Sequence, residues 1–169
     1  MEFETKVQFL TQPEHNRRTI VISDIHGHRA WLEKLLKKVN FSEKDILIIV
    51  GDMIEKGPES LNTIRYIMEL CEKYTVYPMM GNVDLWRIQM LLTEDGSLDQ
   101  ELYETNERMR QSWKATFFQD LCLEAGVSAK TPEEIPAARE AVVVHFQREL
   151  TFMKELPSIL VTPAFTFVH

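Results

Sequence analysis

The sequence predicts an α/β protein: a parallel sheet followed by a helical region. Short β-branched runs alternate with segments of helical periodicity in the first half of the chain. The middle of the chain lacks such runs and is rich in Glu, Arg, Leu and Ala. An extended segment is expected at the carboxyl end of the sequence, after Pro157. With 169 residues, 44% of them apolar, the chain can bury a core without disulfides or a structural metal.

The first half contains three predicted strands. Thr19–Ser23 and Ile46–Val50 are continuous runs rich in β-branched residues, which are typical of strands buried on both faces, and Val76–Met80 is a weaker third. Two segments between them carry apolar residues at the spacing of one helical face: Leu32, Leu35, Leu36 and Val39, then Leu61, Ile64, Met68 and Cys71. Strands alternating with helices imply right-handed crossovers and a parallel βαβαβ core, which we place at residues 19–92.

Residues 93–156 are predicted to be a helical insertion or cap. Helical spacing is seen at Met109, Trp113, Phe117 and Leu121. A further helix is expected to begin near Thr131, which suits an N-cap, and to bury Ala138, Ala141, Val142 and Phe146. Residues 157–169 are expected to return as a strand, Ala164–Val168, that ends on His169.

Composition excludes several classes of function. The net charge of −7, from 19 basic and 26 acidic residues, argues against DNA binding, because phosphate backbones are held by lysine and arginine stripes. No apolar run approaches the roughly 20 residues of a membrane span, and the acidic start lacks a signal-peptide pattern. We therefore expect a cytoplasmic protein without a membrane partner, in which Cys71 and Cys122 are free thiols.

Polar side chains follow each predicted strand. Asp24 and His26 follow the first, Asp52 the second and Asn82 the third, and His169 ends the fourth. Ligands of parallel sheets bind at the carboxyl ends of the strands. Oxygen and imidazole donors without a thiolate suit Mn²⁺, Fe²⁺ or Zn²⁺, and Asp52 could bridge two ions about 3.5–4 Å apart. An aspartate after a strand can also be a simple helix N-cap, but polar residues at four strand ends favour a metal site.

These segments resemble the ordered motifs of the calcineurin-like metallophosphoesterases: D-I-H-G, G-D-M-I-E-K-G-P-E-S-L, G-N-V-D and F-V-H. They are most similar to the phosphoprotein phosphatase branch, with its bacterial serine/threonine phosphatase-like proteins and symmetrical diadenosine tetraphosphatases. The resemblance implies the amino-terminal part of an α-β-β-α sandwich with a helical insertion. It also implies a hydrolase that attacks a phosphomonoester or phosphoanhydride with metal-bound hydroxide.

The resemblance further implies ligands and substrates. Asp24 and His26 would hold the first of two divalent ions, Asp52 would bridge, and Asn82 and His169 would hold the second, with Mn²⁺ favoured over Fe²⁺ or Zn²⁺. The substrate would be a phosphorylated small molecule, a dinucleoside polyphosphate or a phosphoprotein.

Three positions depart from the family pattern. Lys56 replaces an arginine that binds phosphate through two parallel hydrogen bonds, so the substrate should be bound more weakly. Val83 replaces a histidine general acid, and Glu55 replaces the aspartate that orients it. General acid catalysis is typically worth about 10²–10⁴-fold, so we expect phosphoanhydrides or activated esters, with Glu55 or Asp84 as a substitute proton donor. The alternative is a catalytically silent relative that acts as a metal- or protein-binding module.

The family continues beyond F-V-H with a further histidine ligand and strands of a second sheet. We therefore expect residues 1–169 to be a single incomplete domain, weak or inactive by itself, with tighter metal binding at the first site. An uncovered sheet edge would also favour self-association.

Overall fold

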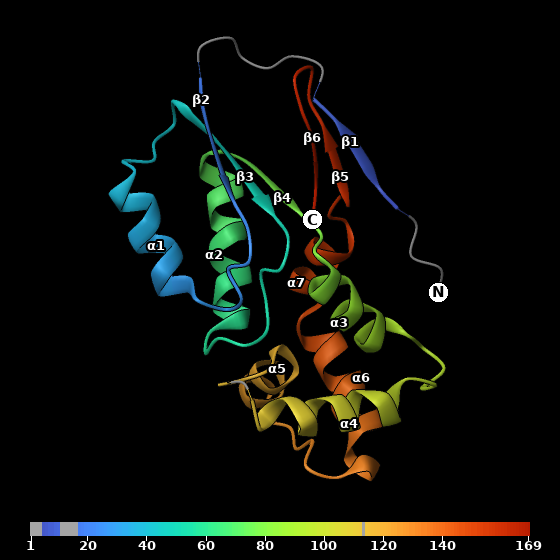
Figure 1. The fold of residues 1–169 in the computed structure, drawn as a ribbon. Coiled ribbons are helices and arrows are strands. Elements are labelled where there is room, and N and C mark those ends of the chain that lie inside the picture. The colour runs from blue at the N-terminus through green and yellow to red at the C-terminus, as the bar shows by residue number, and fades with distance from the viewer. Residues whose placement is uncertain (1–4, 11–16, 113) are drawn as a thin grey trace.

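The computed structural model describes residues 5–10, 17–112 and 114–169. Its strands and helices form three layers above a helical region (Figure 1). The strands are β1 (Val7–Phe9), β2 (Arg18–Ile22), β3 (Asp45–Val50), β4 (Thr75–Met79), β5 (Ile159–Val161) and β6 (Thr166–Val168). The α-helices are α1 (Arg29–Lys38), α2 (Ser60–Lys73), α3 (Asn82–Leu92), α4 (Asp99–Arg110), α5 (Phe117–Ala125), α6 (Ile135–His145) and α7 (Gln147–Lys154).

The predicted parallel sheet is confirmed, with strand order β2-β3-β4. The side chains of β3 alternate between two cores, as the period of a strand requires. Leu47 and Ile49 lie in the larger core beneath the helices, whereas Ile48 and Val50 lie in a smaller cluster with Leu160 of β5. The sheet is therefore covered by helices on one face and in part by a second sheet on the other, where Val21 of β2 remains 47% exposed.

This second sheet corrects an expectation from the sequence. Its order is β1-β5-β6, with β1 parallel and β6 antiparallel to β5. The sequence predicted only one strand after Pro157 and none before residue 19. Each of these strands is three residues long, which is too short to show a periodicity. The pairing also joins distant segments, as in Val7 with Ile159, so the local sequence does not predict these strands.

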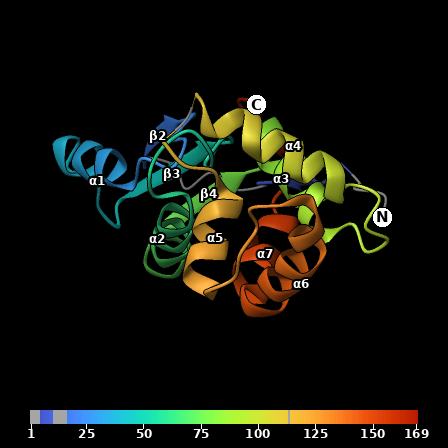
Figure 2. The same cartoon turned by 90° about the horizontal axis from the view of Figure 1, so that it is seen from below.

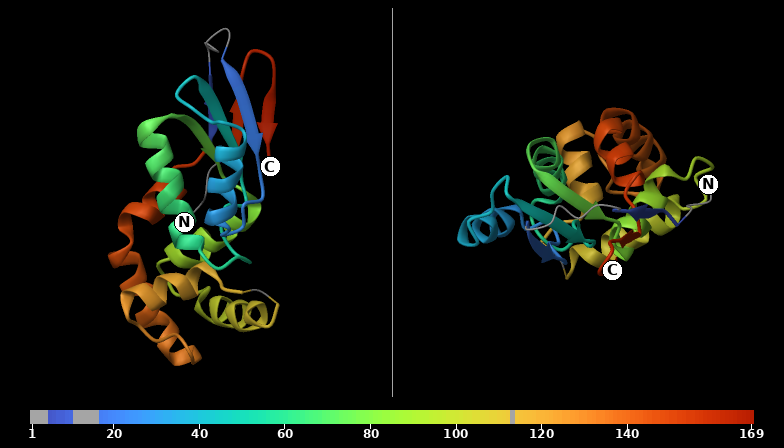
Figure 3. Two further views of the ribbon diagram at one scale, coloured as in Figure 1. Left: turned by 90° about the vertical axis from the view of Figure 1, so that its left-hand side faces the viewer. Right: turned by 90° about the horizontal axis from the view of Figure 1, so that it is seen from above.

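The helical region lies beyond the carboxyl ends of the parallel strands (Figures 2 and 3). One expected helix is divided: α4 ends at Arg110 and α5 begins at Phe117, while Trp113 lies outside the described residues. Thr116 explains the new start, because its hydroxyl accepts a hydrogen bond from Gln119 N at 3.2 Å.

The helix expected near Thr131 begins there as a 3₁₀ turn, Pro132–Glu134, and continues as α6. Ala138, Val142 and Phe146 are buried as expected, and Ala141 is partly exposed. Within the described ranges, no helix has the length and apolar character needed to cross a membrane.

Candidate metal centre

Three of the predicted ligands meet at the carboxyl rim of the parallel sheet. Asp24 and His26 follow β2, and Asp52 follows β3. His26 Nε2 lies 3.7 Å from Asp24 Oδ1 and 3.6 Å from Asp52 Oδ2. One potential ligand atom from each residue lies within 4.8 Å of the other two. The Asp24 side chain is 56% exposed, whereas those of His26 and Asp52 are 12% and 7% exposed, so the group opens to solvent on one side.

All three residues adopt left-handed backbone conformations. Their φ angles are 55° at Asp24, 48° at His26 and 52° at Asp52. Such conformations cost of the order of 1–3 kcal/mol each in non-glycine residues and persist only where the surroundings impose them. Here two backbone hydrogen bonds join the loops: Asp24 N donates to Gly51 O at 3.2 Å and His26 N to Asp52 O at 2.9 Å. Strain concentrated at one cluster of polar residues is typical of a functional site.

The His26 ring is oriented by the loop after β3. Its Nδ1 lies 3.1 Å from Ile54 O, and because a carbonyl can only accept, Nδ1 carries the proton. The Nε2 lone pair therefore faces the carboxylates. Lys56 Nζ lies 2.6 Å from Nε2, so a positive charge already contacts this donor set.

Asp52 lies between two histidines. Its Oδ2 faces His26, and its Oδ1 lies 3.3 Å from His169 Nε2. The His169 ring is held by Val50 O, 2.8 Å from Nδ1, which leaves Nε2 turned toward Asp52. Val83 N also donates to Oδ1, at 3.1 Å. Each oxygen of one carboxylate thus faces a different imidazole, which is the arrangement that a bridging ligand requires.

Asn82 stands at the same rim. It is the exposed first residue of α3. The preceding residue, Gly81, packs so closely on Asp52 that a Cβ there would overlap the Asp52 backbone nitrogen. The end of β4 therefore lies directly against the end of β3, and glycine is required for that approach.

The electrostatic field of the rim favours ionised Asp24. A hydrogen bond with Ser23, together with the charge of Lys56, lowers the pKa of Asp24. An ionised carboxylate beside imidazole lone pairs is suited to a divalent cation.

Asp84 is occupied by backbone donors. Its carboxylate accepts hydrogen bonds from Met53 N at 3.0 Å, Ile54 N at 3.3 Å and Gly81 N at 2.9 Å, and burial raises its pKa to about 6. The side chain has no exposed surface. Asp84 joins the start of α3 to the loop after β3, and we assign it no proton transfer.

Glu55 is likewise interior. Arg87 Nε donates to Glu55 Oε1 at 2.6 Å, Phe117 N donates to Oε2 at 3.2 Å, and both charged side chains are 0% exposed. We therefore assign no proton transfer to Glu55 either. Sequence reasoning missed Arg87, since nothing local marks an arginine whose partner lies 32 residues away.

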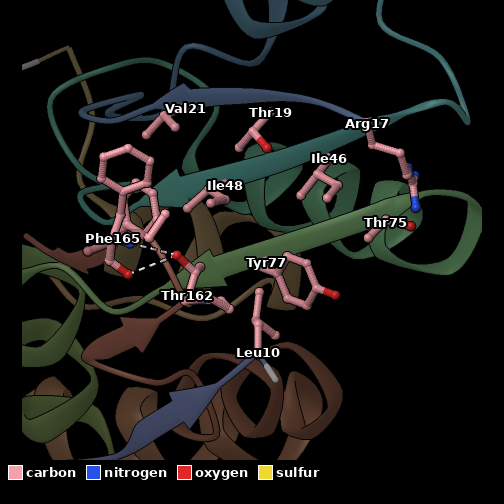
Figure 4. A pocket seen from close by; sticks show the side chains of 13 residues that line it. Leu10, Arg17, Thr19, Val21, Ile46, Ile48, Thr75, Tyr77, Thr162 and Phe165 are labelled. Carbon is pink, nitrogen blue, oxygen red and sulfur yellow. Dashed lines mark hydrogen bonds between the residues drawn. The ribbon is translucent and has the colours of Figure 1, made fainter. Parts of the chain in front are cut away.

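A separate groove lies between the two sheets (Figure 4). Its volume is about 460 Å³, and its walls include Val21, Ile48 and Tyr77 from one sheet and Phe165 from the turn before β6. Val21 is 47% exposed and Phe165 67% exposed. The expected self-association through an uncovered sheet stays a prediction, and the groove marks the surface concerned.

The rim of the sheet defines the class of site. Two carboxylates and two imidazoles whose Nε2 atoms face them, with a lysine ammonium against one of these Nε2 atoms, form a donor set that fits divalent cations of hard to intermediate character. The absence of cysteine from this set distinguishes it from a structural zinc site.

Comparison with known proteins names the family. The family model described as calcineurin-like phosphoesterase matches residues 17–152, so the chain belongs to that family, whose members depend on divalent metals. The match covers Asp24, His26, Asp52 and Asn82 but not His169.

Two curated relatives and one solved structure are similar to this chain. A symmetrical bis(5'-nucleosyl)-tetraphosphatase of Vibrio parahaemolyticus is 41% identical over 68 residues, which are 40% of this chain and 25% of that protein. One of Coxiella burnetii is 34% identical over 92 residues, which are 54% of this chain and 30% of that protein. A solved structure provisionally named a diadenosine tetraphosphatase has a TM-score of 0.55 at 25% identity and covers 98% of this chain and 55% of its own. The chain thus matches only part of the length of each.

Proposed function

We propose that this chain carries the metal centre of a phosphoesterase that hydrolyses phosphoanhydrides, with dinucleoside polyphosphates as the favoured substrates. The observation that supports this most directly is the position of Asp52 between His26 and His169, with one carboxylate oxygen facing each imidazole. The relatives named as tetraphosphatases support the substrate class.

In this proposal Asp24, His26 and Asp52 hold a first ion, and Asp52, Asn82 and His169 hold a second. Manganese is the favoured metal, and the cytoplasm the favoured location. Divalent ions at such a site activate water as a nucleophile and neutralise charge that develops on phosphate oxygens. The ammonium group of Lys56 then holds a phosphate oxygen as a point charge, without the two parallel hydrogen bonds of an arginine.

Leaving-group chemistry favours an anhydride. The Val83 side chain has no acidic proton to donate to a leaving group. The carboxyl groups of Glu55 and Asp84 are buried and accept hydrogen bonds from interior donors. Without a general acid, a leaving phosphate is easier to expel than an alkoxide, because its conjugate acid is far stronger. A seryl phosphate in a phosphoprotein is thus the less favoured substrate.

The second candidate function is a silent metal- or protein-binding module. Val83 is the specific residue that favours it, because it removes the proton donor. Hydrolysis separates the two candidates when it is assayed in a full-length version of the protein: with Mn²⁺ we expect turnover of diadenosine tetraphosphate and of p-nitrophenyl phosphate, abolished in Asp52→Asn.

Asp95→Asn, which changes an exposed carboxylate in the loop between α3 and α4, is the matched control and should retain wild-type turnover. Turnover no greater than that of Asp52→Asn would reject the enzyme and leave the module. Calorimetric titration with Mn²⁺ should show the first site binding more tightly than the second, and two equal tight sites would contradict this ranking.

A further inference from the structure

We propose that Trp31 is a stacking platform for a nucleobase of the substrate. The proposal rests on the function proposed above and deepens it, because it assigns the recognition of the nucleoside to a surface beside the metal centre. It is carried by the exposure of this tryptophan, by its contact with His28, and by the contact of His28 with the loop that bears Lys56.

Trp31 is unusually exposed for its residue type. It is the third residue of α1, a helix that buries Leu32 and Leu36, yet 69% of the Trp31 surface is accessible. Tryptophan is highly buried on average in folded proteins. Leaving this ring in water forgoes hydrophobic stabilisation, which a ligand stacked on it would restore.

The ring has an aromatic neighbour that is itself anchored to the loop after β2. Its centroid lies 4.8 Å from that of the His28 imidazole, with 32° between the two planes. Trp31 N donates to His28 O at 3.0 Å, and His28 Nδ1 lies 3.2 Å from Ile25 O. A pre-oriented aromatic ring loses little conformational entropy when a ligand stacks on it.

Trp31 is connected to the phosphate end of the site by direct contacts. His28 packs on Gly57 so tightly that a Cβ there would lie 2.6 Å from His28 Nδ1. Gly57 follows Lys56, whose ammonium contacts the ligand His26. Figure 1 shows α1 beginning at the end of the sheet where β2 stops. The order from exposed ring to cationic and metal-binding groups matches that of a nucleotide, which has a flat base at one end and anionic phosphate at the other.

The local charge favours a nucleotide over an apolar partner. The chain has a net charge of −7, but α1 contains Arg29, Lys34, Lys37 and Lys38 against the single acidic residue Glu33. Lys34 is exposed and lies one helical turn beyond Trp31, on the same side of the helix. This excess of positive charge on the helix that carries the aromatic face suits an anionic ligand such as a nucleotide.

Replacement of Trp31 should change the preference between substrates. In Mn²⁺, the ratio of kcat/KM for diadenosine tetraphosphate to kcat/KM for inorganic tripolyphosphate should fall about 5- to 100-fold in Trp31→Ala, from the usual loss of base stacking. The change should appear in KM for the dinucleotide more than in kcat, because the ring lies away from the reacting phosphorus. Trp31→Phe should recover most of the ratio, because it restores an aromatic face.

Leu123→Ala is the matched control, because Leu123 is an 83% exposed apolar residue on α5. It should leave the ratio at the wild-type value. An unchanged ratio in Trp31→Ala, with the wild-type chain active on both substrates, would overturn the assignment of Trp31 and leave the proposed function intact.

A binding measurement tests Trp31 without turnover. AMP should quench part of the tryptophan fluorescence of the wild-type chain, and that part should be missing in Trp31→Phe, whereas ribose 5-phosphate, which lacks a base, should have little effect. If the chain hydrolyses neither substrate, the proposed function fails and this quenching still decides on Trp31. Equal quenching by the two compounds, or a Trp31→Ala variant that changes only self-association in sedimentation experiments, would reject the nucleobase platform.

Discussion

We expect the stability of the folded protein to depend strongly on the buried ion pair between Glu55, in the loop after β3, and Arg87 of α3. The perturbation is Arg87→Met, which keeps much of the side-chain volume and removes the charge. The two groups are 2.6 Å apart and both are 0% exposed. Removing the arginine leaves the Glu55 carboxylate without a counter-ion in the interior, with Phe117 N as its one remaining donor among the residues that the structure describes.

Breaking a buried pair in this way typically costs about 3–5 kcal/mol, because the remaining charge is uncompensated. For a chain of this size, 1 kcal/mol corresponds to a shift of roughly 2–4 °C in Tm, so we expect Tm to fall by about 6–20 °C. Glu55→Gln should cost less, because the amide oxygen still accepts from Arg87 Nε and Arg87 also lies over the Trp86 ring, 4.9 Å from its centroid.

The double variant Glu55→Gln/Arg87→Met separates the pair from its surroundings. With both charges removed it should be more stable than Arg87→Met alone, because no uncompensated carboxylate remains in the interior. Thermal and urea unfolding of the four proteins completes the cycle. A loss below about 1 kcal/mol in Arg87→Met, or a double variant less stable than both single variants, would refute this reasoning.

Two further predictions concern the edge and the rim of the sheet. The Arg18 guanidinium lowers the pKa of Asp45 to about 2. The stability that this ion pair contributes at neutral pH should therefore be lost as the pH falls from the ordinary aspartate range toward 2. Asp45→Asn should flatten that part of the profile of Tm against pH, and an unchanged profile would contradict the pairing. Gly81→Ala should abolish Mn²⁺ binding in calorimetry, because its Cβ would displace Asp52. Gly126→Ala, which has open space around it and carries only the backbone strain of a φ of 69° at the end of α5, should still bind; equal affinity in the two variants would disprove the close approach.

The sequence by itself determined the parallel sheet and the chemistry at its rim. Ile46–Val50 forms a strand because a continuous apolar run rich in β-branched residues can be buried on both faces, and strand β3 extends that run by one residue. Parallel strands bring their carboxyl ends to one edge, so the polar residues that follow them meet there whatever the rest of the chain does. That is why Asp24, His26 and Asp52 could be expected together before any distance was known.

Other features depended on contacts between distant segments. The second sheet is built from strands of three residues, which are too short to show a period. Val7 pairs with Ile159 only in the folded domain. Likewise, Glu55 has the spacing of a site residue, but its side chain turns inward because α3 presents Arg87 to it.

Local pattern reports which face of an element is apolar and where a turn begins. The partner of a buried charge, and the direction in which a strained loop turns its side chains, are decided by packing, because those interactions exist only after the elements meet. The rim was therefore predictable in composition, whereas the inward position of Glu55 and the contact of Lys56 with His26 required the tertiary structure.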